Sequence, residues 1–156
     1  MSVEDVREYL RQFGAEDRVL EFDQSSATVE LAAQAVGVSP AQIAKTMAFL
    51  MDDTAIIVVC AGDAKVWSSA FKKQFHAKPK MVPADQLMAL VGHPMGGVCP
   101  FARKAGVACY LDESLRRFQR VWPAAGSENS AIGLTLDELQ RFSAADGWVD
   151  VCKDWQ

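Results

Sequence analysis

The sequence predicts a single α+β domain, a mixed β-sheet flanked by helices, that spans residues 1–156. The chain is long enough to bury one hydrophobic core, and 50% of its residues are hydrophobic. Segments with the period of a strand alternate with segments that have the period of a helix, without one strict repeat. No linker or low-complexity tract divides the chain, which therefore forms one domain.

The first elements are short and have clear boundaries. Ser2–Phe13 has apolar residues on one helical face, so it is expected to form a helix that Ser2 caps and Gly14 ends. Val19–Asp23 alternates in polarity and predicts a short strand. Thr28–Val36 is rich in alanine and predicts a second helix, capped by Thr28 and ended by Gly37.

The next segment contains the strongest strand signal of the chain. Ser39–Gln42 is typical of a helix start, because serine caps, proline fits the first turn and glutamine bonds back to the cap. We expect a short helix with Lys45 near its end, followed by a strand at Met47–Met51. After a turn, Ala55–Ala61 is apolar on both faces, which predicts a strand at the centre of the sheet.

The remaining elements continue this alternation. Helices are expected at Val66–Phe75, Pro83–Val91, Asp112–Phe118 and after Thr135, where Thr-Leu-Asp-Glu forms a capping box. Strands are expected at Val107–Leu111, Arg120–Trp122, Ala131–Leu134 and Trp148–Cys152, the last as a closing edge strand. A mixed sheet with helices around it follows from this order.

The composition excludes several classes of protein. With 23% charged residues and a hydrophobic half, the chain is not disordered, and no apolar run approaches the ~18 residues of a membrane span. The N-terminus has acidic residues where a secretion signal needs basic ones, so a cytoplasmic protein is expected. The four cysteines lack Cys-x-x-Cys spacing and only two histidines are present, which favours reduced thiols over disulfides or a metal site.

A basic window interrupts the acidic average of the chain, whose formal net charge is −4. No acidic residue occurs between Asp63 and Asp85, and this window holds Lys65, Lys72, Lys73, Lys78 and Lys80. One interpretation is a solvated helix and turn. The other is a face that contacts the phosphate backbone of an RNA and steers it, or a nucleotide, toward a nearby cleft.

The chemistry is expected where the regular patterns break. Gly92–Phe101 contains three glycines and two prolines in ten residues. Glycines let a ligand approach the backbone, and prolines stiffen the loop so that its N–H groups stay aimed. Such a loop can bind a carbonyl or a developing oxyanion, although a tight connection between two elements has the same composition. A second break, Ala124–Ser130, is small and polar and by itself is typical of a turn.

Several motifs occur together in the order found in the YbaK/EbsC-type aminoacyl-tRNA deacylases, which the chain resembles over about residues 20–150. They are Ala32-Ala33-x-x-x-Gly37 with Gln42-Ile43-x-Lys45-Thr46, then Gly92-His93-x-x-Gly96-Gly97-x-x-Pro100-Phe101, then Asp112-x-x-Leu115 followed by Trp122-x-Ala124-Ala125-Gly126-Ser127-x-Asn129-Ser130. This family is related to the editing domain of bacterial prolyl-tRNA synthetases. The chain differs from many relatives after Phe101, where Ala102-Arg103 replaces a glycine.

The resemblance implies a fold, an activity and partners. The family fold is a mixed, partly closed β-sheet flanked by helices. The implied activity is that of a free-standing editing enzyme, which hydrolyses the ester of a mischarged tRNA by attack of water. The implied substrate is a small amino acid on a prolyl tRNA. Mischarged tRNA and prolyl-tRNA synthetase are the implied partners, and no metal or cofactor is implied.

The resemblance also assigns roles to individual residues. Lys45 is expected to contact the terminal adenosine or its phosphate, and the backbone of the Gly-x-x-x-Pro loop to hold the aminoacyl group and the attacking water. The residues given a catalytic role are Lys45, Gly96, Gly97 and Pro100. Those expected to line the substrate site are Thr46, His93, Val98, Cys99, Gly126, Ser127 and Asn129. The five lysines of the basic window are expected to bind the tRNA.

Two other functions remain open. Cys99 lies six residues after His93, so the pair is a candidate dyad of a thiol hydrolase that forms a covalent acyl intermediate. Alternatively, the chain is a non-catalytic module that binds RNA or a nucleotide through its lysine face. A covalent acyl-enzyme would support the dyad, and binding without ester cleavage would support the module.

Overall fold

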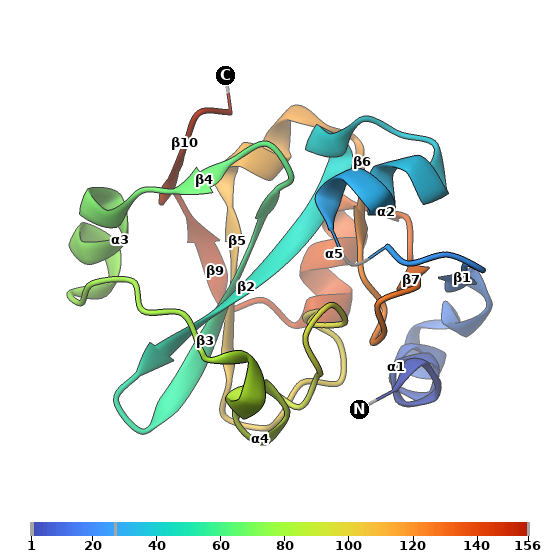
Figure 1. Cartoon of the computed structure of the whole chain (residues 1–156), viewed down its shortest axis with the longest axis horizontal. Coiled ribbons are helices and arrows are strands. Elements are labelled where there is room, and N and C mark those ends of the chain that lie inside the picture. The colour runs from blue at the N-terminus through green and yellow to red at the C-terminus, as the bar shows by residue number, and fades with distance from the viewer. Residues whose placement is uncertain (1, 27, 156) are drawn as a thin grey trace.

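The computed structural model describes residues 2–26 and 28–155 and contains a mixed sheet, as the sequence predicts (Figure 1). Six strands lie in the order β8-β6-β2-β3-β5-β9. Their bounds are Ile43–Met51 (β2), Thr54–Ala61 (β3), Ala108–Asp112 (β5), Arg120–Pro123 (β6), Leu134–Thr135 (β8) and Gly147–Val149 (β9). β2 and β3 are antiparallel, whereas β6 joins β2 in parallel and β5 and β9 extend the sheet in parallel beyond β3. The α+β class is therefore confirmed.

The apolar faces of β3 put this strand at the centre of the core. Every residue from Ala55 to Ala61 is buried, and β2 and β5 cover the two edges of the strand. On one face, Phe71 of α3 (Ser68–Phe75) packs on Phe49 of β2, with ring centroids 4.8 Å apart. α3 is thus attached to the sheet by aromatic packing. None of the helices in the described residues has the length and hydrophobicity of a membrane span.

Three helices begin at the capping residues that the sequence indicates. The side chains of Ser2, Thr28 and Thr135 accept hydrogen bonds from the first turns that follow them. The first N–H groups of a helix have no partner within the helix, so these bonds decide where each helix starts. The helices are α1 (Val3–Leu10, continued by a 3₁₀ turn at Arg11–Phe13), α2 (Val29–Val36) and α5 (Leu136–Ser143).

Lys45 lies on β2 and not near the end of a short helix, so that prediction is wrong. The helix signature of Ser39–Gln42 produces a single 3₁₀ turn, Pro40–Gln42, with its capping box in place. From Ile43 the chain pairs with β3 and β6, and Lys45 stands opposite Cys60. Pairing in the sheet therefore overrides the local helix signal after one turn.

Strand pairing also divides other predicted segments. Val66, the predicted start of the helix Val66–Phe75, belongs instead to the strand β4 (Lys65–Val66), because β4 pairs with Cys152–Lys153 (β10). The predicted closing strand Trp148–Cys152 is thereby split between β9 and β10. The predicted strand Ala131–Leu134 is split as well: β7 (Ser130–Ala131) pairs with β1 (Leu20–Glu21), and β8 begins at Leu134.

Two segments predicted as α-helices are wholly or partly 3₁₀ helix. The segment at Pro83–Val91 is a 3₁₀ turn, Ala84–Gln86, followed by the short α4 (Leu87–Leu90). The segment after Asp112 is a 3₁₀ helix, Glu113–Arg117, and another 3₁₀ turn at Glu16–Arg18 leads into β1. Short connections between packed elements leave too little length for a regular α-helix.

Candidate functional site

The candidate site lies beside an unpaired stretch of β2. One edge of β2 is covered by β3 along the strand. On the other edge, β6 pairs with the first two residues, and the segment Lys80–Val82 bonds to Ala48 and Leu50. Between these two contacts, no strand of the described residues pairs with this second edge of β2 at Lys45–Met47. These three residues are half-buried, whereas the residues on either side are buried.

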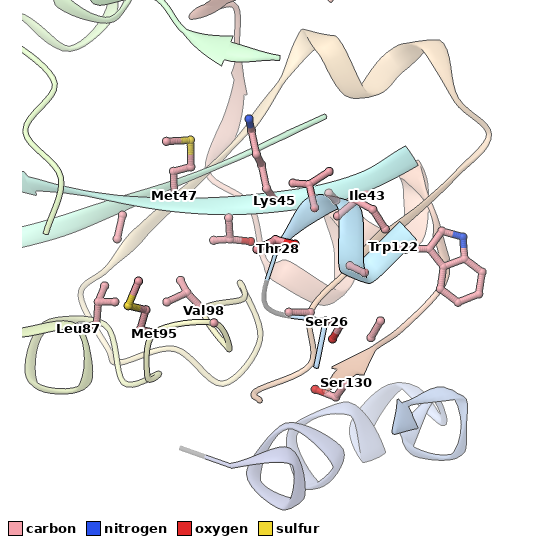
Figure 2. A pocket seen from close by; sticks show the side chains of 18 of the residues that line it. Ser26, Thr28, Ile43, Lys45, Met47, Leu87, Met95, Val98, Trp122 and Ser130 are labelled. Carbon is pink, nitrogen blue, oxygen red and sulfur yellow. The ribbon is translucent and has the colours of Figure 1, made fainter. Parts of the chain in front are cut away.

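A cavity of about 480 Å³ lies at this gap (Figure 2). Much of its wall is apolar and includes Met47, Met81, Val82, Leu87, Met95 and Val98. Its polar side chains are Ser26, Thr28, Lys45, Thr46 and Ser130. Among residues 2–26 and 28–155, no three His, Cys, Asp or Glu side chains gather as metal ligands do. A mainly apolar cavity with a few polar groups is the usual form of a small-molecule site.

The unpaired stretch of β2 offers backbone groups to the cavity. The Leu50 N–H donates to the Lys80 carbonyl at 2.8 Å, and the Ala48 carbonyl accepts the Val82 N–H at 3.0 Å. Along a strand, the N–H and C=O of every second residue point to the same edge. The N–H and C=O of Thr46 therefore point to this edge, at the gap beside the cavity.

Thr46 also has a side-chain oxygen without a partner. Its Oγ1 is buried and forms no hydrogen bond with any described residue. A buried polar atom left unpaired costs about 1–3 kcal/mol of stability. Because Thr46 lines the cavity, a bound ligand can supply the missing hydrogen bond.

Lys45 is at the boundary between the cavity and the surface. Figure 2 shows its side chain extending from β2 away from Met95 and Val98. Its ammonium group donates a hydrogen bond to the carbonyl of Ala64. The neighbouring Asp63 is ion-paired with an arginine, Arg117 Nη2 to Asp63 Oδ1 at 2.6 Å, which lowers the pKa of this carboxyl.

The glycine-rich loop faces β2 across the cavity (Figure 2). Gly96 and Val98 line the cavity, and Gly96 has a φ of 86°, which glycine adopts without strain. Pro100 is buried and does not line the cavity. The guanidinium group of Arg103 donates to the carbonyls of Pro100 and Ser143 at 2.9 and 2.5 Å, so the end of the loop is anchored to α5.

The exit of this loop has a left-handed turn at Ala102, where the family resemblance leads us to expect glycine. Ala102 has a φ of 54°. The left-handed conformation costs a residue with a Cβ about 1–2 kcal/mol. The hydrogen bonds of Arg103, the next residue, offset this cost and hold the turn in place.

Two glycines bring the two irregular loops into contact. A Cβ on Gly97 would lie 2.8 Å from the backbone of Gly126 and Ser127. Gly126 has a φ of 100°, and a Cβ there would lie 2.8 Å from the Ser2 carbonyl oxygen and from Val6. Backbone atoms cannot turn aside as a side chain can. Both positions therefore require glycine, and neither Gly97 nor Gly126 lines the cavity.

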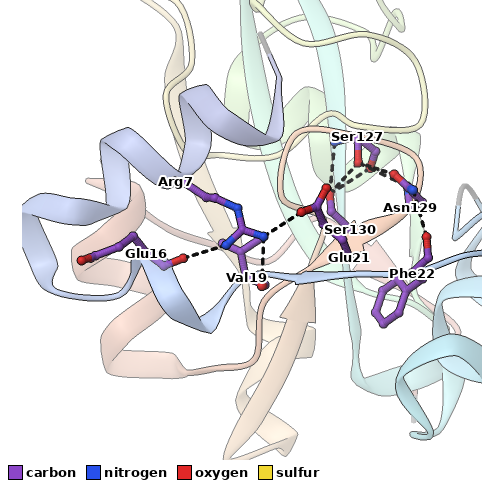
Figure 3. A network of polar contacts seen from close by, with 8 residues as sticks. All are labelled: Arg7, Glu16, Val19, Glu21, Phe22, Ser127, Asn129 and Ser130. Atoms are coloured by element: carbon purple, nitrogen blue, oxygen red, sulfur yellow. Dashed lines mark hydrogen bonds and ion pairs between the residues drawn. The ribbon is translucent and has the colours of Figure 1, made fainter.

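A polar network fixes the second loop (Figure 3). The Ser127 hydroxyl donates to Asn129 Oδ1 at 2.8 Å and lies 2.9 Å from Ser130 Oγ. Asn129 Nδ2 donates to the Phe22 carbonyl at 2.9 Å. Ser127 and Asn129 are expected from the sequence to wall the substrate site, but they do not line the cavity, whereas Ser130 does.

His93 and Cys99 meet in the interior and not in the cavity. His93 Nε2 lies 2.7 Å from the Phe101 carbonyl oxygen and 3.7 Å from Cys99 Sγ. Both side chains are fully buried, and neither lines the cavity. Burial raises the pKa of the Cys99 thiol to about 12 and lowers the pKa of His93. A neutral, inaccessible thiol is a poor nucleophile, so the geometry does not support a catalytic dyad.

The lysines of the basic window are exposed and lie on three elements. Lys65 is on β4, and Lys72 and Lys73 are in the last turn of α3. Lys78 and Lys80 are in the segment that follows. Lys80 precedes Met81 and Val82, which line the cavity, so this end of the window reaches the site.

Most of the apolar wall of the cavity carries no signal in the sequence. Met47, Met81 and Met95 line the cavity, and Met95 is 72% exposed at its mouth. Single methionines have no local pattern that distinguishes them from core residues. Trp122 and Ser130 also line the cavity; both belong to a family motif, which was the signal that could have identified them.

The chain is similar to proteins of known family. Residues 23–142 match the aminoacyl-tRNA editing domain family. An uncharacterized protein of Bacillus subtilis (strain 168), YwhH, is 46% identical over the full length of both chains. A solved structure described as a proposed trans-editing enzyme for prolyl-tRNA synthetase has a TM-score of 0.87 and 26% identity, and the match covers 97% of this chain and 96% of that one. A solved structure of a hypothetical protein has a TM-score of 0.83 and 27% identity, over 96% of this chain and 99% of that one.

Proposed function

This chain belongs to the aminoacyl-tRNA editing domain family, and from this premise we propose that it hydrolyses the ester of a mischarged tRNA. The proposed substrate is a tRNA that carries a small amino acid, and a prolyl tRNA is the first candidate because the similar solved structure is described as an editing enzyme for prolyl-tRNA synthetase. The observation that most supports this proposal is the cavity between the unpaired edge of β2 and the loop Gly96–Pro100.

The proposed reaction depends mainly on positioning, because an aminoacyl ester is an activated bond. Water attacks the ester carbonyl, the bond between this carbon and the ribose oxygen breaks, and the free amino acid and the ribose hydroxyl leave. Negative charge develops on the carbonyl oxygen during the attack. We assign its stabilisation to the N–H groups of Gly96 and Val98, since the Gly97 N–H already donates to the Pro94 carbonyl; Gly97, Pro100 and Arg103 hold this part of the loop in place.

Lys45 and Thr46 are assigned to the two ends of the substrate. Lys45 provides a positive charge at the boundary between the cavity and the surface, where it can bind a phosphate of the terminal nucleotide. Thr46 provides two acceptors, its carbonyl at the open edge and its unpaired Oγ1, for the α-ammonium group of the amino acid. The exposed lysines at positions 65, 72, 73, 78 and 80 are assigned to the tRNA backbone.

A deacylation screen tests the proposed function directly. Purified protein is incubated with a panel of tRNAs charged with alanine, serine, cysteine, threonine, 2-aminobutyrate or the cognate amino acid. We expect hydrolysis of at least one small aminoacyl ester on a prolyl tRNA and little hydrolysis of prolyl-tRNA itself. Binding of these tRNAs without cleavage of any of them would contradict the proposal and favour a non-catalytic RNA-binding module.

Thr46→Val should lower activity and raise stability. The substitution keeps the shape of the side chain but removes the hydroxyl, so the buried unpaired oxygen disappears and the free energy of unfolding should rise by about 1 kcal/mol. The loss of a hydrogen bond to a charged group should lower kcat/KM by about 10-fold to 100-fold. Thr46→Ser, which keeps the hydroxyl, should stay close to wild type in activity. Unchanged turnover by the valine variant would remove Thr46 from the substrate site.

Cys99→Ala should remain active, because the proposed nucleophile is water. The sulfur is buried outside the cavity, so its removal should cost about 1 kcal/mol of stability and leave most of the turnover. Cys109→Ala, which removes another buried thiol, serves as the control. Turnover and intact mass are measured on the mischarged substrate. An inactive Cys99→Ala together with an acylated wild-type protein would instead establish the dyad.

A further inference from the structure

The surface next to Lys45 holds two like charges side by side. β4 and β10 form an antiparallel ribbon in which Lys65 lies directly opposite Lys153. Directly opposed residues in such a ribbon have their side chains on the same face, and a like-charged pair there is unfavourable. Both lysines are exposed, and neither is ion-paired with any residue of the described chain. An anionic ligand bound at this face would remove the repulsion.

Trp67 stands beside this pair of lysines. Its side chain is 48% exposed, although its backbone is fixed by a hydrogen bond from its N–H to the Val151 carbonyl at 2.8 Å. Trp67 also lines a surface groove together with Lys153 and Trp155. Proteins bind single-stranded nucleic acids with exposed aromatic rings on which bases stack, next to positive charges that meet the phosphates. The ribbon has both parts of this arrangement.

The ribbon is linked to the wall of the cavity through Lys45. The Lys45 ammonium group bonds to the Ala64 carbonyl, and Ala64 immediately precedes Lys65. Three residues of extended chain span at most about 11 Å, so Trp67 lies within this reach of Ala64. Asp150 and Asp154 also line the groove, so they balance the charges of Lys65 and Lys153 and leave no net positive charge there. Stacking on Trp67 is therefore needed in addition to the two lysines.

We propose that Trp67, Lys65 and Lys153 bind the single-stranded 3′ end of the tRNA, with a base stacked on Trp67 and phosphates at the two lysines. This inference rests on the proposed function, because the nucleotides concerned are those that precede the esterified adenosine. The surface takes no part in the hydrolysis. It increases the affinity for the whole tRNA and leaves the reaction of a small ester unaffected.

Three measurements on Trp67→Ala test the proposal. The first is hydrolysis of mischarged tRNA, for which KM should rise about tenfold at unchanged kcat. The second is hydrolysis of an aminoacyl-adenosine ester, which lacks the preceding nucleotides and should react as with wild type. The third is equilibrium binding of uncharged tRNA with and without its single-stranded 3′ end. Compared with wild type, the variant should bind the intact tRNA about tenfold more weakly and the shortened tRNA equally well.

Matched variants separate stacking from structural effects. Trp67→Phe keeps an aromatic ring and should restore most of the affinity. Leu20→Ala shortens another exposed apolar side chain, on β1, and should change nothing. Lys153→Ala should make the slope of log affinity against log salt concentration shallower by about one unit, the contribution of one phosphate contact.

The outcomes distinguish this proposal from the proposed function. Unchanged KM and affinity for intact tRNA in Trp67→Ala overturn the docking surface, and a protein partner becomes the better occupant of the groove. Equal losses on tRNA and on the small ester also overturn it, because Trp67 then supports the cavity or the fold. If wild-type protein cleaves neither substrate, the proposed function fails, while the binding measurement still decides whether Trp67 contacts the 3′ end.

Discussion

Lys45→Ala is expected to lower kcat/KM for a mischarged tRNA by about 100-fold while the protein stays folded. The charge of Lys45 is held half-buried at the end of the cavity, where a hydrogen bond to a phosphate or ribose is worth about 1.5–3 kcal/mol. The same substitution removes one hydrogen bond to the Ala64 carbonyl, which should cost only about 1 kcal/mol of stability. Steady-state kinetics and thermal unfolding of the two proteins measure these effects.

Lys104→Ala is a matched control for this prediction. Lys104 Nζ donates to the Ala89 carbonyl at 2.8 Å, so its removal also breaks a lysine-to-backbone hydrogen bond, but Lys104 does not line the cavity. The control should lose little activity. Wild-type turnover by Lys45→Ala would exclude this lysine from the reaction, and an equal loss in both variants would mean that the loss comes from a change in the fold.

Gly97→Ala is expected to have the second large effect, about 100-fold on kcat/KM, although Gly97 is outside the cavity lining. The new Cβ would lie 2.8 Å from the backbone of Gly126 and Ser127, so the two loops must move apart. The N–H groups of Gly96 and Val98 would move with them, and a displacement of about 1 Å at a reacting centre can cost 10²-fold in rate. Strain of this kind should also lower the free energy of unfolding by about 1–3 kcal/mol.

Gly147→Ala is the control for the glycine prediction. A Cβ on Gly147 would meet no atom within 4 Å, and its φ is not positive, so this variant should match wild type in both stability and turnover. Because Gly97→Ala can fold poorly, its activity is measured at a temperature where circular dichroism shows it fully folded. A folded Gly97→Ala with normal turnover would show that the close contact of the loops does not position the reactive backbone.

Much of the local structure could be predicted from the sequence. The capping residues Ser2, Thr28 and Thr135 act through hydrogen bonds to residues three positions away, so their signals are complete within one turn. The central strand Ala55–Ala61 is recognisable because both of its faces are apolar. Lys45 shows the limit of such reasoning: its local sequence favours a helix, and only the pairing with β3 and β6 makes it part of a strand.

The candidate site could be predicted only in part. Lys45, Thr46, Gly96 and Val98 were identified from motifs and do line the cavity, although their roles stay proposals. Gly97 and Gly126 were identified as well, but their part is the close approach of two loops and not contact with the cavity. The methionines of the wall and the unpaired edge of β2 were not predicted, because neither has a pattern within its own segment.

The α+β class, the family and the loops in which the chemistry is sought follow from the sequence alone, since they depend on composition, capping and motif spacing within short stretches. Three further features depend on the folded chain: which residues share the cavity, the burial of Cys99 and His93 away from it, and the pairing of Lys65 with Lys153. Each of these results depends on contacts between segments far apart in the chain. Such contacts are set by the packing of the whole core and by the pairing of strands, which short-range patterns do not encode.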